Sequence, residues 1–260
     1  MINAWRTRQG VDRVCPMQAI LSDIHGNLEA LEAVLNDAAS QGATDVYCLG
    51  NVFGFGGPNP RECVDLAMQW KCVLLGKHDL AAFTSLDTYP AYAQNALRWA
   101  WSQINAGDDG RRRNFVECLP RYHSETDFLL VHGSPRHPLQ ESVTLEDVFD
   151  AQKIVHLFSF VDRYCFVGRT QQPGVLTDDW RVIRPKNVGL DYRLDERKAI
   201  INVGSVGQPK DKDWRACYVL LDGDTVRFRR VEYDVETTIR KVHAIAELEN
   251  SLGDRLREGR

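Results

Sequence analysis

Short apolar runs separated by amphipathic or polar segments dominate the first two thirds of the chain. Five of these runs have the length of a buried strand, and they span residues 19–21, 45–49, 72–75, 127–131 and 164–167. Helices are expected between them, at 28–38, at 61–70, within 90–120 and at 144–158. The first helix is the best defined, because Leu28, Leu31 and Leu35 form one apolar face and Asn27 is a suitable N-cap. Alternating strands and helices predict a largely parallel sheet layer.

The last third of the chain is richer in adjacent strands. A hairpin is expected at 175–184 with Asp178 and Asp179 near its turn, and further strands at 199–203, 217–221 and 225–231. Asp222-Gly223 is a strong turn signal between the last two strands, and Asp234 caps a final helix that we expect to run to Glu249. This part of the chain therefore predicts a second, mixed sheet packed on the first.

Composition and charge narrow the class of protein. The chain has 260 residues, of which 43% are hydrophobic and 26% charged. We expect one domain over residues 17–260, preceded by an irregular arm at 1–16. The formal net charge of −4 gives no electrostatic case for nucleic acid, and no apolar run is long enough to span a membrane. The sequence leaves the oligomeric state undetermined.

The cysteines indicate the cellular compartment. Their number, seven, is odd, and the sequence lacks a Cys-x-x-Cys pair, so neither a zinc site nor a disulfide framework is suggested. Four of them lie in apolar strand-like runs, namely Cys48, Cys72, Cys165 and Cys217. Reduced core cysteines of this kind predict a cytoplasmic protein.

Polar side chains gather where the expected strands end. They are Asp23, His25, Asn51, Lys77, His78, Asp79, His132, Arg169 and Gln171. Open α/β sheets bind ligands at the carboxyl ends of their strands, so these residues are candidates for one site. Asp23 and His25 suit a divalent metal ion. A second interpretation stays open, in which Asp23 caps a turn and His25 is a partly buried packing residue.

The order and spacing of these residues resemble the calcineurin-like metallophosphoesterases. That family carries, in order, Asp-x-His, Gly-Asp, Gly-Asn-His-Asp, Val-His-Gly and Gly-His-Thr-His. The segments at 131–135, 202–209 and 233–252 also look like blocks of its small bacterial members. The resemblance implies an α/β (α+β) fold with two mixed β-sheets packed as a sandwich and flanked by helices, a four-layer α-β-β-α arrangement. It also implies hydrolysis of phosphate esters by two divalent ions.

Five positions match the family pattern. By resemblance, Asp23 and His25 correspond to ligands of the first metal ion, and His132 corresponds to a ligand of the second. His78 corresponds to the catalytic histidine that meets the substrate phosphate or the leaving group, and Asp79 corresponds to the residue that orients it.

Four positions depart from the pattern, and all four correspond to metal ligands. Asn51 replaces the bridging aspartate, Lys77 replaces an asparagine, and Arg169 and Gln171 replace both histidines of the last motif. An amide oxygen is neutral and bridges two cations poorly, while protonated Lys and Arg side chains have no lone pair to offer. We therefore expect no normal dinuclear centre. One Mn, Mg, Fe or Zn ion, weakly bound by Asp23 and His25 with help from Asn51, Gln171 or His132, stays compatible with the sequence.

The substitutions leave the expected pocket positively charged. One hypothesis is that Lys77 and Arg169 replace the charge of the second metal ion and, with His78 and Gln171, bind a phosphate ion or a phosphate-containing small molecule such as a nucleotide. The alternative is that both cations pair with Asp23, Asp79 or surface carboxylates.

Three functions remain open from the sequence. The first is a phosphate-binding protein with impaired or no hydrolysis. The second is an active phosphoesterase that uses one metal ion or none, in which Lys77 and Arg169 stabilise the transition state and His78 protonates the leaving group. The third is a scaffold that keeps the fold for a partner surface.

Overall fold

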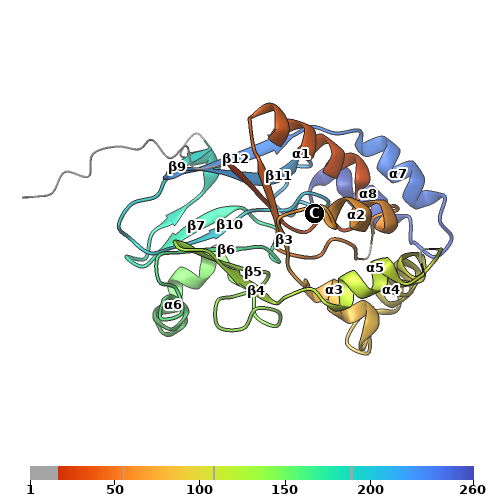
Figure 1. Cartoon of the computed structure of the whole chain (residues 1–260), viewed down its shortest axis with the longest axis horizontal. Coiled ribbons are helices and arrows are strands. Elements are labelled where there is room, and N and C mark those ends of the chain that lie inside the picture. The colour runs from red at the N-terminus through yellow and green to blue at the C-terminus, as the bar shows by residue number, and fades with distance from the viewer. Residues whose placement is uncertain (1–16, 55, 108, 188–189) are drawn as a thin grey trace, which may run out of the picture.

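Two six-stranded mixed sheets form the centre of the computed structural model (Figure 1). The structure describes residues 17–54, 56–107, 109–187 and 190–260, so the arm expected at 1–16 lies outside the described residues. The first sheet has the order β3 (Cys72–Val73), β2 (Asp45–Cys48), β1 (Gln18–Leu21), β11 (Ala216–Asp222), β12 (Thr225–Val231) and β9 (Asp191–Arg193). The second has the order β4 (Tyr122–Ser124), β5 (Phe128–Val131), β6 (Tyr164–Val167), β10 (Ala199–Asn202), β7 (Gly174–Thr177) and β8 (Val182–Ile183).

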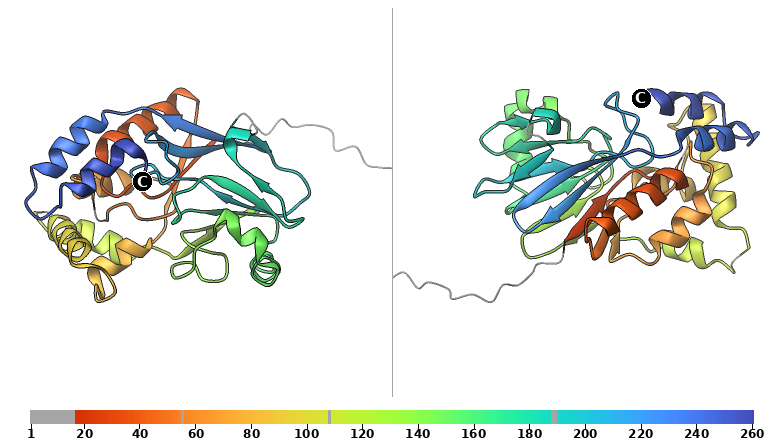
Figure 2. Two further views of the ribbon diagram at one scale, coloured as in Figure 1. Left: turned by 180° about the vertical axis from the view of Figure 1, so that it is seen from behind. Right: turned by 90° about the horizontal axis from the view of Figure 1, so that it is seen from above.

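Helices flank both sheets. They are α1 (Leu28–Ser40), α2 (Pro60–Ala67), α3 (Lys77–Phe83), α4 (Ala91–Ile104), α5 (Arg111–Glu117), α6 (Ala151–Phe158), α7 (Val235–His243) and α8 (Ser251–Asp254), with 3-10 turns at Leu145–Phe149, Pro185–Asn187 and Arg255–Glu258. Helix α6 lies against the second sheet, apart from the group formed by α1, α2, α7 and α8 (Figures 1 and 2). The layered α/β architecture predicted from the sequence is thus confirmed. Within the described residues, none of the helices combines the length and the apolar character needed to cross a membrane.

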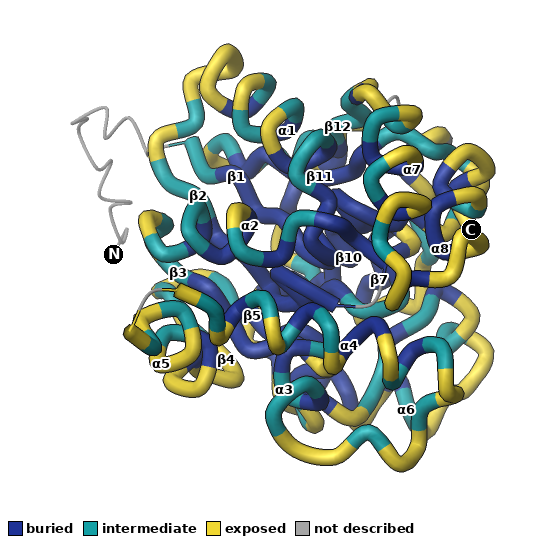
Figure 3. The backbone as a smooth tube through the Cα atoms, turned by 90° about the vertical axis from the view of Figure 1, so that its right-hand side faces the viewer, coloured by how far each residue is buried: buried dark blue, intermediate teal, exposed yellow. Residues whose placement is uncertain are grey.

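The inner strands β6, β10 and β11 are largely apolar because both of their faces are buried (Figure 3). In β1, Ala19 and Leu21 face the helical layer, while Ile20 packs between the two sheets. In β10, Ile201 packs between the sheets and Ile200 packs against the α6 layer. Side chains alternate between the faces of a strand, so a strand covered on both sides reads as a continuous apolar run.

Several helix boundaries differ from those expected. The helix predicted at 144–158 is a 3-10 turn followed by α6, because Asp150 adopts an extended backbone and its side chain caps α6 by accepting from the Lys153 N–H. The segment at 90–120 forms two helices separated at Gly107 and Gly110, both of which have a positive φ. The final helix is capped by Asp234 as expected, but it ends at His243 rather than at Glu249.

The cysteines expected in the core are found there in three of four cases. Cys48, Cys165 and Cys217 are buried, whereas Cys72 is half-buried at the short edge strand β3. The described cysteines are all free thiols, and Cys15 lies outside the described residues.

The turn after β1 is clamped between two loops. A Cβ atom added at Gly57 would collide with the His25 carbonyl oxygen, and one added at Gly207 would collide with the Ile24 carbonyl oxygen. Backbone hydrogen bonds fix the same turn, because Asp23 N–H donates to Gly50 O at 3.0 Å and Gly207 N–H donates to Asp23 O at 2.9 Å. The position of the turn is therefore set by close backbone packing.

Gly207→Ala should destabilise the protein by about 2 kcal/mol, because a methyl group has no space against a backbone carbonyl and the loop must shift. The free energy of unfolding from urea titration measures this effect. Gly253→Ala is the control, since its new Cβ would come no closer than 3.3 Å to Val242. Equal stabilities of the two variants would contradict the clamp.

Candidate functional site

The residues singled out by the sequence meet beyond the carboxyl ends of β1, β2, β5 and β6. Six of their polar side chains are almost completely buried there, namely those of Asp23, His25, Asn51, Asp79, His132 and Gln171. Non-glycine residues with a left-handed backbone also concentrate at this place: Asp23, His25, Asn51, Arg169 and Gln171 have φ values of 56°, 53°, 54°, 65° and 62°. Such backbone conformations cost about 1 kcal/mol or more each and persist only where the surrounding structure fixes them. The strand ends are thus shaped to direct side chains inward.

Asp23 is the centre of this cluster. Its Oδ2 accepts from the Ser22 hydroxyl at 2.7 Å and from the Arg169 backbone N–H at 2.9 Å. Its Oδ1 accepts from the side-chain amides of Asn51 at 2.8 Å and Gln171 at 3.2 Å. Burial on its own would raise the pKa of Asp23, but its hydrogen bonds and the nearby histidines together hold that pKa far below the usual range. Asp23 is therefore ionised and fully hydrogen-bonded.

His25 lies between the side chains of Gln171 and Asp23. Its Nε2 lies 2.8 Å from Gln171 Nε2 and 3.3 Å from Asp23 Oδ1. The Gln171 amide nitrogen donates to His25 Nε2, while His25 Nδ1 is buried and has no hydrogen-bond partner among the described residues. The pKa of His25 is lowered, because the effect of burial outweighs the hydrogen bond and the negative charge of Asp23, which would raise it. The Gln171 amide thus binds both Asp23 and His25, the two side chains that match ligands of the first metal ion.

Asn51 and Asp79 tie the strand ends to α3. Asn51 Oδ1 accepts from the His78 backbone N–H at 2.9 Å. The Asp79 carboxylate accepts from the backbone N–H groups of Asn51 at 2.7 Å, Gly76 at 2.9 Å and Phe53 at 3.3 Å. Burial raises the pKa of Asp79 to about 7, against the effect of these hydrogen bonds. Asp79 therefore holds the loop around Asn51, and its action on His78 stays a prediction.

The two remaining histidines lie at the edge of this cluster. The rings of His78 and His25 have centroids 5.2 Å apart, and the pKa of His78 is held well below its usual value by burial. His132 Nδ1 lies 3.0 Å from Leu49 O, so it carries the ring proton and donates to that carbonyl. His132 Nε2 is buried and has no hydrogen-bond partner among the described residues. Burial lowers the pKa of His132 to about 4, which leaves a free lone pair facing the cluster.

Lys77 and Arg169 lie close together but are engaged differently. The Lys77 ammonium is exposed and sits 5.4 Å from the centroid of the Tyr89 ring. Arg169 turns to the loop at 139–142, where Nε donates to Ser142 Oγ at 2.7 Å, Nη2 donates to Gln140 O at 2.9 Å, and Nη1 donates to Leu139 O. Within the described part of the chain, neither cation has a carboxylate partner within 4.0 Å. The alternative in which both pair with carboxylates is therefore not what the structure shows.

Two further cations near Asp23 were not singled out from the sequence. Burial is the main cause that lowers the pKa of His25, and the positive charges of Lys210 and Arg255 lower it further. Arg255 Nη2 donates to Gln208 Oε1 at 3.0 Å, and Gly56 leaves the space that this pair occupies. Lys210 directly follows the segment 202–209, whose resemblance to a block of the family could have drawn attention to it. Nothing in the sequence pointed to Arg255.

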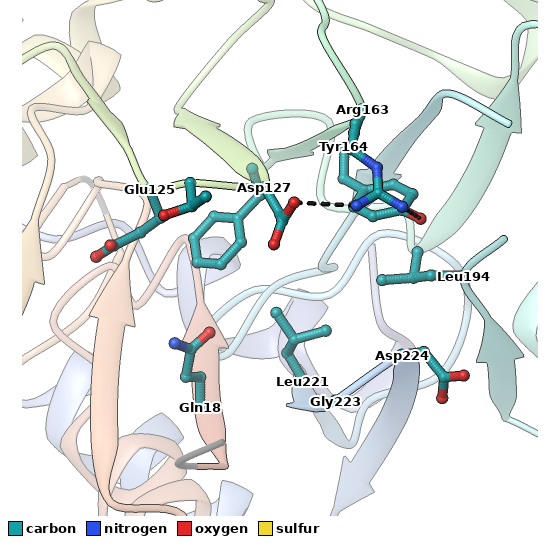
Figure 4. A pocket seen from close by; sticks show the side chains of 11 residues that line it. Gln18, Glu125, Asp127, Arg163, Tyr164, Leu194, Leu221, Gly223 and Asp224 are labelled. Atoms are coloured by element: carbon teal, nitrogen blue, oxygen red, sulfur yellow. Dashed lines mark hydrogen bonds and ion pairs between the residues drawn. The ribbon is translucent and has the colours of Figure 1, made fainter. Parts of the chain in front are cut away.

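Two other observations limit where a ligand could bind. Among the residues that the structure describes, no group of three or more His, Cys, Asp or Glu side chains is arranged to hold a metal ion. A hollow of about 320 Å³ lies at the amino end of β1, the opposite end of that strand from Asp23 (Figure 4). It is lined by Gln18, Phe128 and Tyr164, with Asp127 and Arg163 paired at 3.0 Å, and it contains none of the residues predicted for the site.

Comparisons with known proteins agree with the geometry of the fold. The family model described as "Calcineurin-like phosphoesterase superfamily domain" matches residues 17–225. An uncharacterized protein of Methanocaldococcus jannaschii is 33% identical over 253 residues, covering 94% of this chain and 98% of that protein. The crystal structure of a metallophosphoesterase from Sphaerobacter thermophilus has a TM-score of 0.79 at 34% identity, covering 94% of this chain and 99% of that one. A hypothetical protein from Pyrococcus horikoshii shares the fold, with a TM-score of 0.72 at 22% identity over 94% and 98% of the two chains.

Proposed function

We propose that this chain, which belongs to the calcineurin-like phosphoesterase superfamily, binds a phosphate-containing small molecule or a phosphate ion and has lost two-metal hydrolysis. The observation that carries the proposal is the position of Gln171. Its side-chain amide lies 3.2 Å from Asp23 Oδ1 and 2.8 Å from His25 Nε2. A metal ion on those two atoms would have to displace this amide.

The side chains at the metal-ligand positions also support the loss of the dinuclear centre that is typical of the family. Lys77 and Arg169 carry no lone pair, and the Asn51 amide nitrogen already donates to Asp23 Oδ1 at 2.8 Å. Of the positions matching the second metal site, only His132 Nε2 remains a buried acceptor without a partner in the described residues. Two divalent ions need several oxygen or nitrogen ligands each. These residues do not fit such a centre.

The charge of the site favours an anion instead. Lys77 presents an exposed ammonium beside His78, and a phosphate oxygen is a natural partner for that charge. His132 Nε2 carries a lone pair and can only accept a hydrogen bond. The hydroxyl group of a monohydrogen phosphate or of a sugar could donate that hydrogen bond. The sequence predicted that Arg169 binds the phosphate, but its guanidinium N–H groups donate hydrogen bonds to the loop at 139–142 instead. We therefore assign Arg169 to holding that loop and Lys77 to contacting the anion.

Inorganic phosphate should raise the melting temperature of the purified protein, and Lys77→Ala should reduce that increase. A ligand at 100 times its Kd stabilises the folded state by about 2.7 kcal/mol, which corresponds to several degrees. The matched control is Lys71→Ala, which removes a half-exposed lysine that lies 3.8 Å from Asp45 at the amino end of β3, whereas Lys77 lies beyond the carboxyl end of that strand.

The same preparation tests for lost hydrolysis. We expect no chelator-sensitive hydrolysis of p-nitrophenyl phosphate or bis-p-nitrophenyl phosphate with added Mn²⁺. Rapid hydrolysis that EDTA abolishes would contradict the loss of two-metal chemistry. An equal response of wild type and Lys77→Ala to phosphate would contradict the role of Lys77.

A further inference from the structure

A second region of the surface collects positive charge outside the candidate site. A cleft of about 790 Å³ opens between the 3-10 turns at Leu145–Phe149 and Pro185–Asn187, the loop at 210–215 and strand β12. Seven of its lining residues are Lys or Arg and three are Asp or Glu. The chain as a whole carries a formal charge of −4, whereas this cleft has a positive net charge.

The arginines of the cleft are neutralised by carboxylates. Four ion pairs account for them: Arg184 with Glu146 at 3.5 Å, Arg215 with Asp213 at 2.7 Å, Arg229 with Asp37 at 2.7 Å, and Arg230 with Asp211. Each pair contributes no net charge. The excess positive charge of the cleft therefore comes from its lysines.

Three lysines carry this excess, namely Lys186, Lys210 and Lys212. All three are exposed, and within the described ranges none lies within 4.0 Å of a carboxylate oxygen. They come from two segments that are distant in sequence and face one cleft. Although Lys210 reaches solvent, the protein around its ammonium group partly excludes water, and this desolvation together with the charge of Arg255 lowers the pKa of Lys210. An anion beside it would relieve this unfavourable environment.

The wall of the cleft is rigid and is shared with the candidate site. Lys210 N–H donates to Gln171 O at 3.3 Å, and Gln172 Nε2 donates to Lys210 O at 3.3 Å. Lys212 has a left-handed backbone with a φ of 68°, and its N–H donates to Gly259 O at 3.0 Å. The backbone positions of Lys210 and Lys212 are thus fixed by contacts to two other segments.

We propose that this cleft is a separate binding site for a small polyphosphate, with Lys186, Lys210 and Lys212 as the groups that contact the anion. Three unpaired ammonium groups match a ligand that carries three or more negative charges better than they match a single phosphate. A volume of about 790 Å³ lies within the usual range for small-molecule sites and exceeds what one phosphate group needs. The proposal is independent of the function assigned to the Asp23 cluster.

Isothermal titration with sodium tripolyphosphate tests the proposal, with sodium orthophosphate as the comparison. We expect one tripolyphosphate per chain to bind in the cleft more tightly than orthophosphate does, and more tightly than a second tripolyphosphate binds at the candidate site. The affinity of this first ligand should fall as the salt concentration rises. The double variant Lys186→Ala/Lys212→Ala should bind tripolyphosphate at least about tenfold more weakly, since two charged contacts are lost.

Two further variants locate the ligand. Lys71→Ala removes a lysine outside both sites and should change the tripolyphosphate affinity by less than about twofold. Lys77→Ala should weaken anion binding at the candidate site alone and change the affinity of the tighter, cleft-bound tripolyphosphate by less than about twofold. Undetectable tripolyphosphate binding, or an affinity unchanged in the double variant, would overturn the proposal. A loss confined to Lys77→Ala would place the anion at the candidate site and would also overturn it, while leaving the proposed function intact.

Discussion

Restoring the four substituted ligand positions together should give the protein tight Mn²⁺ binding. The variant is Asn51→Asp, Lys77→Asn, Arg169→His and Gln171→His, and its affinity for Mn²⁺ should exceed that of the wild type by at least about 100-fold. The physical reason lies in the hydrogen bonds of the cluster. Gln171 and Asn51 now satisfy Asp23 with amide N–H groups, and replacing both amides returns Asp23 and His25 to acting as ligands. Isothermal titration with MnCl₂ and the metal content after dialysis measure the effect.

The backbone favours this gain of metal binding. Asp23, His25, Asn51 and Gln171 already combine left-handed backbones with buried side chains, and Arg169 shares the left-handed backbone, so restored ligands would need no rebuilding of the loops. Adding Asp23→Asn to the fourfold variant is the control, because it removes the carboxylate that corresponds to a first-metal ligand in the family without changing the shape of the side chain. Mn²⁺ affinity that stays at the wild-type level in the fourfold variant would show that the correspondence of these positions to metal ligands is wrong.

The fold could be predicted because its sequence signals are local. Strands buried on both faces read as apolar runs, and the caps Asn27 and Asp234 are set by side chains that bond their own helices. The errors also have local causes. Helix α3 was missed because it begins directly after a short strand, at Lys77, and its first turn is fixed by Asp79 binding loop N–H groups. Strand β9 was missed because it spans three residues and depends on pairing with β12.

The candidate site was predictable as a list of residues but not as a network. The sequence identified Asp23, His25 and Gln171, yet nothing in it shows that the Gln171 amide lies between the other two. It suggested that Arg169 faces the anion, whereas the structure directs its guanidinium to carbonyl groups at 139–142. Which donors a long side chain uses depends on loops far away in sequence. Such contacts leave no periodic signal.

Acidification should destabilise the protein through its buried histidines, most clearly through His132. Its pKa is about 4 in the folded state, whereas an unfolded histidine has a pKa of about 6.5. Between these values the unfolded chain binds a proton that the folded protein does not, so the free energy of unfolding falls as the pH falls. The stability contributed by neutral His132 is therefore present above about pH 6.5 and declines by about 3 kcal/mol as the pH approaches 4. His25 and His78, whose pKa values are also lowered by burial, act in the same direction.

Urea unfolding at several pH values from 7 to 4.5 measures this effect, with His132→Gln as the informative variant. A glutamine side chain has an amide that can donate to Leu49 O, but it does not titrate. The difference in unfolding free energy between wild type and His132→Gln should therefore change with pH, with the wild type losing more stability on acidification. His243→Gln, which replaces an exposed histidine 3.1 Å from Asp254 and outside the buried cluster, is the control for the His-to-Gln change itself. Parallel curves for wild type and His132→Gln would mean that His132 takes up its proton in the folded state, so the ring would not be the neutral, buried acceptor that a ligand donor needs.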